Sequence, residues 1–208
     1  MNRPDTRTVD TNLLVLHALR CVGASGFGRL SLVTGLDESA VESEVLDLEA
    51  VGLVRRVPGA MSGWWLTDAG RAADAERITA ELEAAGARGA VGAAYDRFLV
   101  LNPELLDLCT AWQLRSVDGS TVANDHGDPG YDSRVLDRFA DLDRRAATVR
   151  AELAAVLPRF GRYGVRLTDA LDRAASGELE YVTDSLASYH TVWAELHEDL
   201  LATLGLRR

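Results

Sequence analysis

Apolar residues recur at helical spacing along most of the chain, and this pattern predicts a mainly α protein. The clearest case is 37–51, where valine and leucine occupy one face of a helix that an acidic N-cap begins and Gly52 ends. Two short strand-like runs follow at 53–57 and 64–67, and the proline and glycines between them permit a chain reversal. A helix followed directly by a small hairpin is the core of a winged helix.

Shorter helices are predicted on either side of this core. The segments 11–22 and 27–34 precede it, and Gly35 forms the turn before the long helix. Thr67 is a suitable N-cap for a further helix over 68–85. The resulting order of helix, helix, turn, helix and hairpin is the order that a winged helix-turn-helix requires.

Part of this segment follows the spaced pattern L-x-x-x-G-L-V-x-R and then L-T-x-x-G-R. The matching residues are Leu48, Gly52, Leu53, Val54, Arg56, Leu66, Thr67, Gly70 and Arg71. In this pattern, about the first eighty residues resemble the winged helix-turn-helix of MarR-like bacterial transcription regulators. The resemblance implies a regulator that binds double-stranded DNA as a homodimer. It is less specific for function than for fold, because function has to be argued from the site.

The rest of the chain is predicted to form a second, helical domain. Gly86, Gly89 and Gly92 interrupt an alanine-rich stretch without matching a phosphate-binding loop. We place the boundary there, between a winged-helix domain at 1–88 and a helical effector-binding or dimerisation domain at 89–208. The second domain is expected to be an antiparallel bundle. Its predicted elements are helices at 94–101, 103–114 (with Asn102 and Pro103 as cap and first residue), 133–157, 162–175 and 180–204, and a long loop at 116–132.

Charge and composition argue against a strong nucleic-acid binder and against a membrane protein. The net charge is −10, and residues 1–80 hold 8 Arg against 11 Asp and Glu, so neither half is the basic body of a strong nucleic-acid binder. All 22 basic residues are arginine, which we attribute to genomic composition bias. No apolar run is long enough to span a membrane, and the first ten residues lack a signal-peptide pattern, so we expect a cytoplasmic protein without membrane contact.

The exposed face of the helix after Asp37 is the first candidate binding surface. It offers Ser39 and Ser43 as hydrogen-bond donors, but Glu42 and Asp47 on the same face repel phosphate. The predicted DNA-contacting residues are Arg29, Ser39, Ser43, Arg55, Arg56 and Arg71. The acidic helix leaves an alternative open, in which the winged helix is a protein-interaction module that does not bind DNA.

The last helix is the second candidate. His190, Trp193 and His197 share one of its faces, although two histidines seven residues apart are about 10 Å apart along the axis and cannot grip a metal alone. An aromatic stripe that packs a helix interface explains them without a ligand. The residues predicted around an effector pocket in the bundle are Trp112, Tyr163, Tyr189, His190, Trp193 and His197.

The sequence predicts no catalysis, cofactor or metal. Cys21 and Cys109 lack C-x-x-C spacing and are interpreted as small core residues, and His17, without a ligand-spaced neighbour, as a surface or core-edge histidine. The loop from Asp125 to Asp132 lacks calcium-loop spacing, and turn chemistry explains its composition. A metal-dependent enzyme, formed by this loop and the histidine stripe, is a third and less favoured alternative.

Overall fold

A computed structural model describes residues 10–59 and 62–206. The chain divides into two compact units: the first contains the described residues up to Leu82 and again from Leu201, and the second runs from Glu83 to Leu200. The predicted boundary at 88/89 lies in the same region of the chain. Both units are mainly helical, and the mainly α fold class with a small β wing is confirmed.

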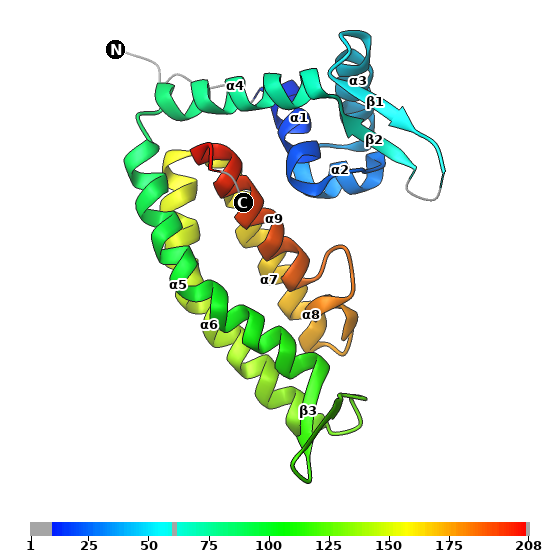
Figure 1. Ribbon diagram of the computed structural model, residues 1–208, viewed down its shortest axis with the longest axis vertical. Helices are drawn as coiled ribbons and strands as arrows, with labels where there is room; N and C mark the ends of the chain where they lie inside the picture. Colours follow the sequence, from blue (N-terminus) through cyan, green and yellow to red (C-terminus); the bar gives the residue numbers. More distant parts are fainter. Residues whose placement is uncertain (1–9, 60–61, 207–208) are drawn as a thin grey trace. The chain divides into compact units, whose positions relative to one another are not determined.

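The first unit is a winged helix (Figure 1). Its elements are α1 (Thr11–Val22), α2 (Phe27–Thr34), α3 (Glu38–Ala50), β1 (Val54–Val57), β2 (Gly63–Leu66) and α4 (Asp68–Ala84). The predicted bounds agree with those of α1 and α2 at both ends. Each helix ends before a glycine with positive φ, Gly23 for α1 and Gly35 for α2. The predicted pattern L-x-x-x-G begins in α3, whose N-cap is Asp37.

One apolar core holds these elements together. It is formed by the inward faces of the first three helices and of the wing strands, with contributions such as Leu16, Val45 and Leu66. Trp64 of β2 stacks on Phe27 of α2 with ring centroids 6.0 Å apart, which ties the wing to the helices. The interior positions of α3 predicted from its apolar spacing are buried in this core.

The turn from α3 into β1 is held by backbone contacts to the start of α4. Gly52 has a φ of +75°, and the Leu53 amide donates to the Leu48 carbonyl, which closes the helix end. The Thr67 hydroxyl donates to the Gly52 carbonyl (2.8 Å) and accepts from the Gly70 amide (3.0 Å). A Cβ added to Gly70 would lie 1.9 Å from the Leu53 carbonyl oxygen, so only glycine fits there.

The wing is an antiparallel hairpin with a third, single-residue strand contact. Val54 pairs with Leu66 and Arg56 with Trp64, which sets the register. Ser25 exchanges two backbone hydrogen bonds with Trp64, of 3.2 and 2.9 Å. The loop that joins the two strands includes residues 60 and 61, which lie outside the described part of the chain.

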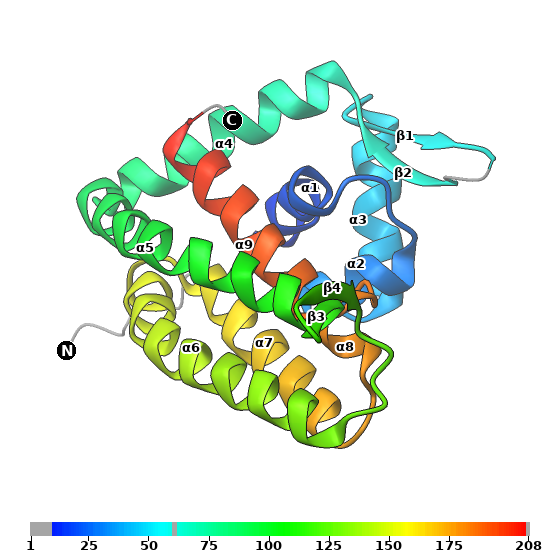
Figure 2. The same cartoon turned by 60° about the horizontal axis from the view of Figure 1, so that its bottom comes forward.

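The second unit is an antiparallel helical bundle with a small hairpin at one end (Figures 1 and 2). Its elements are α5 (Arg88–Gln113), β3 (Leu114–Val117), β4 (Ser120–Ala123), α6 (Pro129–Val156), the 3-10 helix η1 (Pro158–Phe160), α7 (Gly161–Ala175), α8 (Glu180–Thr183) and α9 (Tyr189–Leu204), whose final turn falls in the first unit. The long helices α5 and α6 lie side by side, and α7 packs on α6. Stacked rings such as Phe98 on Trp193, 4.7 Å apart, fill the bundle core.

The structure corrects the predicted break in the first bundle helix. Gly89, Gly92 and Pro103 all lie within the continuous α5, and only Gly86, with a φ of +59°, forms a turn. Pro103 lacks an amide proton and therefore removes one helical hydrogen bond. The packing of α5 on α6 compensates for that missing bond.

The predicted loop at 116–132 is also wrong over its first half and over its last four residues, 129–132, which are the first residues of α6. Residues 114–123 form the hairpin β3–β4, in which Val117 pairs with Ser120. Asp118 and Gly119 form the turn with φ values of 49° and 79°, the conformation that an Asp-Gly pair favours in a two-residue hairpin turn. This Asp-Gly pair is the feature of the sequence from which the hairpin could have been predicted.

The predicted helix at 180–204 is interrupted. It is divided into α8 and α9 by residues 184–188, and Ser188 caps α9 through a hydrogen bond from the Thr191 amide to its hydroxyl (3.2 Å). Two serines in this segment favour local side-chain hydrogen bonds over helix continuation. Across the described residues, every helix is too short or too polar to cross a membrane.

We expect Gly70→Ala to lower the free energy of unfolding by about 3 kcal/mol, because its methyl group would overlap the Leu53 carbonyl. The control is Gly92→Ala in α5, where nothing lies within 4 Å of the added Cβ and helix propensity favours alanine by about 1 kcal/mol. Urea denaturation of both variants measures the difference. Equal stability of Gly70→Ala and the wild type would contradict the close contact.

Candidate nucleic-acid interface

The outward face of α3 is exposed and mostly acidic. Ser39, Glu42, Ser43 and Asp47 all lie on this face, and Leu46 is 48% exposed between them. No arginine belongs to α3, so its face contributes hydrogen-bond donors through two serines only. This arrangement favours contacts to base edges or to a basic partner over contacts to phosphate.

The N-terminus of α3 carries a carboxylate cap. The Ser39 hydroxyl donates to Asp37 Oδ1 (2.7 Å), and the Ala40 amide donates to the same atom (2.8 Å). These two hydrogen bonds, the first above all, hold the pKa of Asp37 below its usual range. The negative charge at this end of the helix opposes phosphate binding there, and the Ser39 hydroxyl proton is already engaged.

Three predicted arginines surround α3 with exposed side chains. Arg55 and Arg56 lie on β1, and Arg71 lies in the first turn of α4. Within the described part of the chain, none of the three forms a hydrogen bond or an ion pair with a side chain, so their guanidinium groups are available to phosphate. Arg29 on α2 is half-buried and engaged within the protein.

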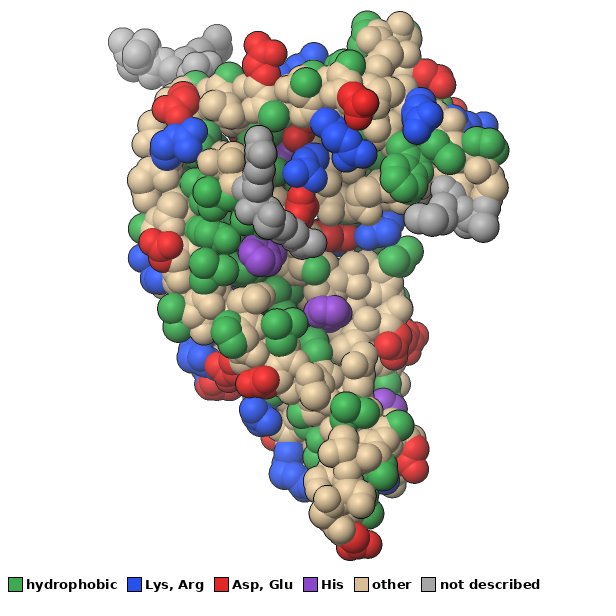
Figure 3. Space-filling view, viewed as in Figure 1, with side chains coloured by type: hydrophobic (Ala, Val, Ile, Leu, Met, Phe, Trp, Pro, Cys, Tyr) green, Lys and Arg blue, Asp and Glu red, His purple; other side chains and the backbone are tan. Residues whose placement is uncertain are grey.

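Arg55 and Arg56 project from opposite faces of the wing. Arg55 pairs with Trp65 and Arg56 with Trp64, and successive residues of a strand point to opposite sides. On the face drawn in Figure 3, basic and acidic side chains are interspersed and form no continuous basic surface. The interface therefore offers a few separate cationic contacts beside an acidic helix.

A network of polar side chains fixes α3 against its neighbours. Glu44, the half-buried carboxylate of α3, accepts hydrogen bonds from Thr11 and from Asn12 Nδ2 (3.1 Å) at the start of α1. Asn12 Oδ1 in turn accepts from Arg77 of α4 (2.9 Å). Glu44 thus positions the candidate recognition helix and does not belong to its binding face.

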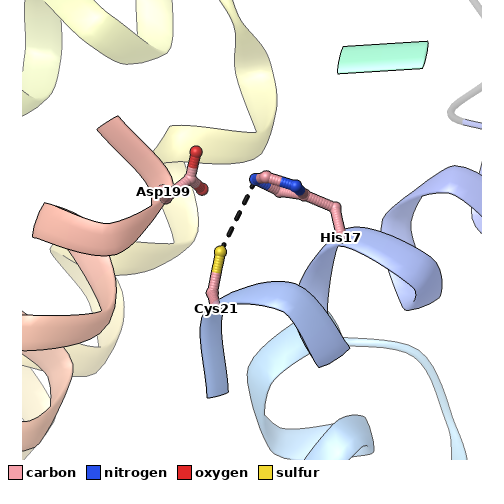
Figure 4. A group of neighbouring side chains, drawn as sticks. All are labelled: His17, Cys21 and Asp199. Atoms are coloured by element: carbon pink, nitrogen blue, oxygen red, sulfur yellow. Dashed lines mark hydrogen bonds between the residues drawn. The ribbon is translucent and has the colours of Figure 1, made fainter. Parts of the chain in front are cut away.

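A second polar cluster lies inside the first unit and was missed in the sequence. His17 Nδ1 lies 2.9 Å from Asp74 Oδ1, with side-chain exposures of only 4% and 2%. On the other side of the ring, His17 Nε2 lies 3.6 Å from Cys21 Sγ (dashed line in Figure 4). His17 and Cys21 are four residues apart in α1, a spacing that is visible in the sequence, whereas Asp74 comes from α4.

The aromatic residues of the predicted effector set are core residues of the bundle. Trp112, Tyr163, Tyr189 and Trp193 are each at most 5% exposed, and His190 and His197 are half-buried. Trp193 donates through Nε1 to Asn102 Oδ1 (3.0 Å), and His197 packs against Phe98. Ligand binding by this set stays a prediction, and the structure shows what the residues do without a ligand.

A cavity of about 260 Å³ opens between α6 and α7. Its lining comprises Leu136, Asp137, Ala140, Asp143, Thr168, Leu171, Asp172 and Ala175. Asp143 accepts hydrogen bonds from Arg150 (2.7 and 3.1 Å) and from the Tyr189 hydroxyl (3.0 Å). Tyr189 is the member of the predicted set that reaches the cavity wall, and burial raises the pKa of its hydroxyl far above the usual range.

The predicted polar loop packs against the end of α5 and the start of α6. Asn124 Nδ2 donates to the Trp112 carbonyl (3.0 Å) and to Asp132 Oδ1 (2.8 Å). His126 Nδ1 lies 3.0 Å from Asp132 Oδ2, and the His126 ring lies 4.6 Å from that of Trp112. These contacts join the residues that follow β4 to α5 and α6, which gives the loop a structural role.

Comparison of the chain with protein-family models, with curated proteins and with solved structures finds no match. The residues and contacts described above are therefore the features that bear on function.

We expect Asn124→Ala to lower the free energy of unfolding by about 2 kcal/mol, because the Trp112 carbonyl and buried Asp132 would both be left without this donor. Thr121→Ala on the exposed strand β4 is the control and should change stability by less than about 0.5 kcal/mol. Thermal unfolding followed by circular dichroism compares them. A destabilisation no larger for Asn124→Ala than for the control would contradict the role of Asn124.

Proposed function

We propose that the protein is a winged-helix transcription regulator that binds double-stranded DNA through its first unit. The observation that carries the proposal is the set of exposed guanidinium groups, Arg55, Arg56 and Arg71, around α3 of a winged helix. They supply the sequence-independent contacts to phosphate. Ser43 then remains as a donor on α3 for base edges.

The acidic face of α3 limits this interaction and shapes its expected properties. Glu42 and Asp47 reduce attraction to the DNA backbone, so affinity should depend on a small number of phosphate contacts. A homodimer would double those contacts, as two-fold symmetric regulators do on paired half-sites. We therefore propose a dimer that binds with a shallow salt dependence.

Control is proposed to come from the helical second unit. An effector that binds one arrangement of the bundle better than another would shift the population of DNA-binding conformations. The bundle offers a cavity for such a ligand between α6 and α7. Arg150 offsets the charge of Asp143 in its wall, and the remaining aspartates of the lining, Asp137 and Asp172, favour a cationic compound over an anionic one.

A second candidate function is supported by α3 itself. Carboxylates and the apolar Leu46 lie together on its exposed face, which has no cation. Such a face is suited to bind a basic, partly apolar surface of another protein. In this alternative the first unit is an interaction module that does not bind DNA.

The test is a titration of the full chain with its own upstream DNA and with a scrambled duplex, at about 50 and about 200 mM salt. We expect tighter, salt-weakened binding to the upstream fragment. Arg55→Gln combined with Arg56→Gln should weaken binding to both duplexes. The log–log salt slope should fall by about two, because two phosphates are no longer neutralised by arginine.

Arg138→Gln, an exposed arginine on α6, is the matched control and should leave affinity unchanged. Replacement of Glu42 and Asp47 by Gln and Asn should strengthen DNA binding, because two carboxylates near phosphate are removed. Absence of binding to either duplex at low salt would exclude DNA binding by the unliganded protein and leave the protein-interaction function.

A further inference from the structure

We propose that α3 selects cytosine and thymine in the major groove of double-stranded DNA. Glu42 and Asp47 accept hydrogen bonds from the amino group of cytosine, and Leu46 contacts the methyl group of thymine. This selectivity rests on the proposed function, because it concerns the bases that the same winged helix would contact. The exposed side of α3 carries carboxylates and an apolar side chain and has no cation.

Glu42 and Asp47 are available to accept hydrogen bonds from a ligand. Both residues are exposed, and within the described part of the chain neither carboxylate takes part in a hydrogen bond or an ion pair. Glu44 on the same helix differs, because its carboxylate already accepts from Thr11 and Asn12. Two of the carboxylates of α3 are therefore open acceptors, whereas Glu44 holds the helix in place.

The two open carboxylates flank the exposed face of α3. Asp47 comes five residues after Glu42, which in an α-helix is a rotation of about 140° and a rise of about 7.5 Å. Ser39, Ser43 and Leu46 lie between them around the helix, and Leu46 is 48% exposed. Since a rise of about 7.5 Å is close to two base-pair steps of about 3.4 Å, the two carboxylates can contact different base pairs in one groove.

The chemistry of a carboxylate determines which base it selects. An ionised carboxylate only accepts hydrogen bonds, so it favours a base that presents a donor. In the major groove, cytosine presents its N4 amino group, whereas guanine presents N7 and O6 and thymine presents O4, all of which are acceptors. Adenine has an N6 amino group, but the N7 acceptor beside it repels a carboxylate. Glu42 and Asp47 therefore favour cytosine at the positions that they contact.

Leu46 adds a preference for thymine. The methyl group of thymine is the apolar group that base pairs present in the major groove, and contact with an exposed leucine removes apolar surface from water. No arginine or lysine belongs to α3 that could form a bidentate contact to guanine. The exposed cations Arg55, Arg56 and Arg71 belong to other elements and contact phosphate in the proposed complex. Base selection thus falls to the carboxylates and to Leu46.

The test begins with duplexes that carry a randomised central segment, from which the full chain selects at about 50 mM salt. We expect the enriched duplexes to share cytosine and thymine at fixed positions. Replacement of a shared C·G pair by T·A should weaken binding about tenfold, because the O4 acceptor of thymine would then face a carboxylate.

Glu42→Gln separates base recognition from general electrostatic repulsion. Glutamine forms a bidentate contact with N6 and N7 of adenine, so this variant should prefer A·T to C·G at one position only. Asp47→Asn should make the same change at a second position. Affinity for a scrambled duplex should rise in both variants, because a negative charge near phosphate is removed. Glu76→Gln, an exposed glutamate of α4, is the matched control and should leave every preferred base unchanged.

The contact of Leu46 is tested with duplexes in which the shared thymine is replaced by deoxyuridine, which lacks only the methyl group. The wild type should lose about fourfold in affinity on this change, the effect expected for one buried methyl group. Leu46→Ala should bind the two duplexes equally.

The outcomes separate this selectivity from DNA binding itself. No enrichment and no binding at low salt would overturn both, and would leave the acidic face of α3 to a basic protein partner. DNA binding would stand, and the selectivity would be overturned, if the wild type, Glu42→Gln and Asp47→Asn all preferred the same bases.

Discussion

The winged helix depends on one close contact between backbone segments. Gly70 at the start of α4 lies against the Leu53 carbonyl, and the Thr67 hydroxyl donates a hydrogen bond to the Gly52 carbonyl beside it. We call this junction of residues 52–53 with residues 67–70 the corner. This corner fixes the direction in which β1 leaves α3 and in which α4 leaves β2. The wing, the candidate recognition helix and α4, with Asp74 on its inner side, all take their positions from it.

The residues that produce the family resemblance mostly serve this corner and the core beneath it. Leu48 and Leu66 are buried, Gly52 and Gly70 meet backbone requirements, and Thr67 is a cap. Among the matched positions only the arginines offer exposed cations. The resemblance thus describes a fold, and the charges on the exposed face of α3 bear on what that fold binds.

Local signals in the sequence predicted local structure well. Glycines at helix ends and the caps Asp37 and Thr67 located the winged-helix elements nearly residue by residue. The continuity of α5 through Pro103 could not be predicted locally, because packing on α6 decides it. The pairing of His17 with Asp74 spans 57 residues and no periodicity predicts it. Distances in space, and not residue types, define that cluster.

Pro103 makes α5 easier to bend at one point than along the rest of its length. The Leu99 carbonyl has no amide partner four residues ahead, and Leu99 is 39% exposed, so water can hydrate the gap. The helix α5 is continuous but has one locally flexible turn near its middle. Bending of the bundle would concentrate there, and amide hydrogen exchange within α5 would begin around the same turn.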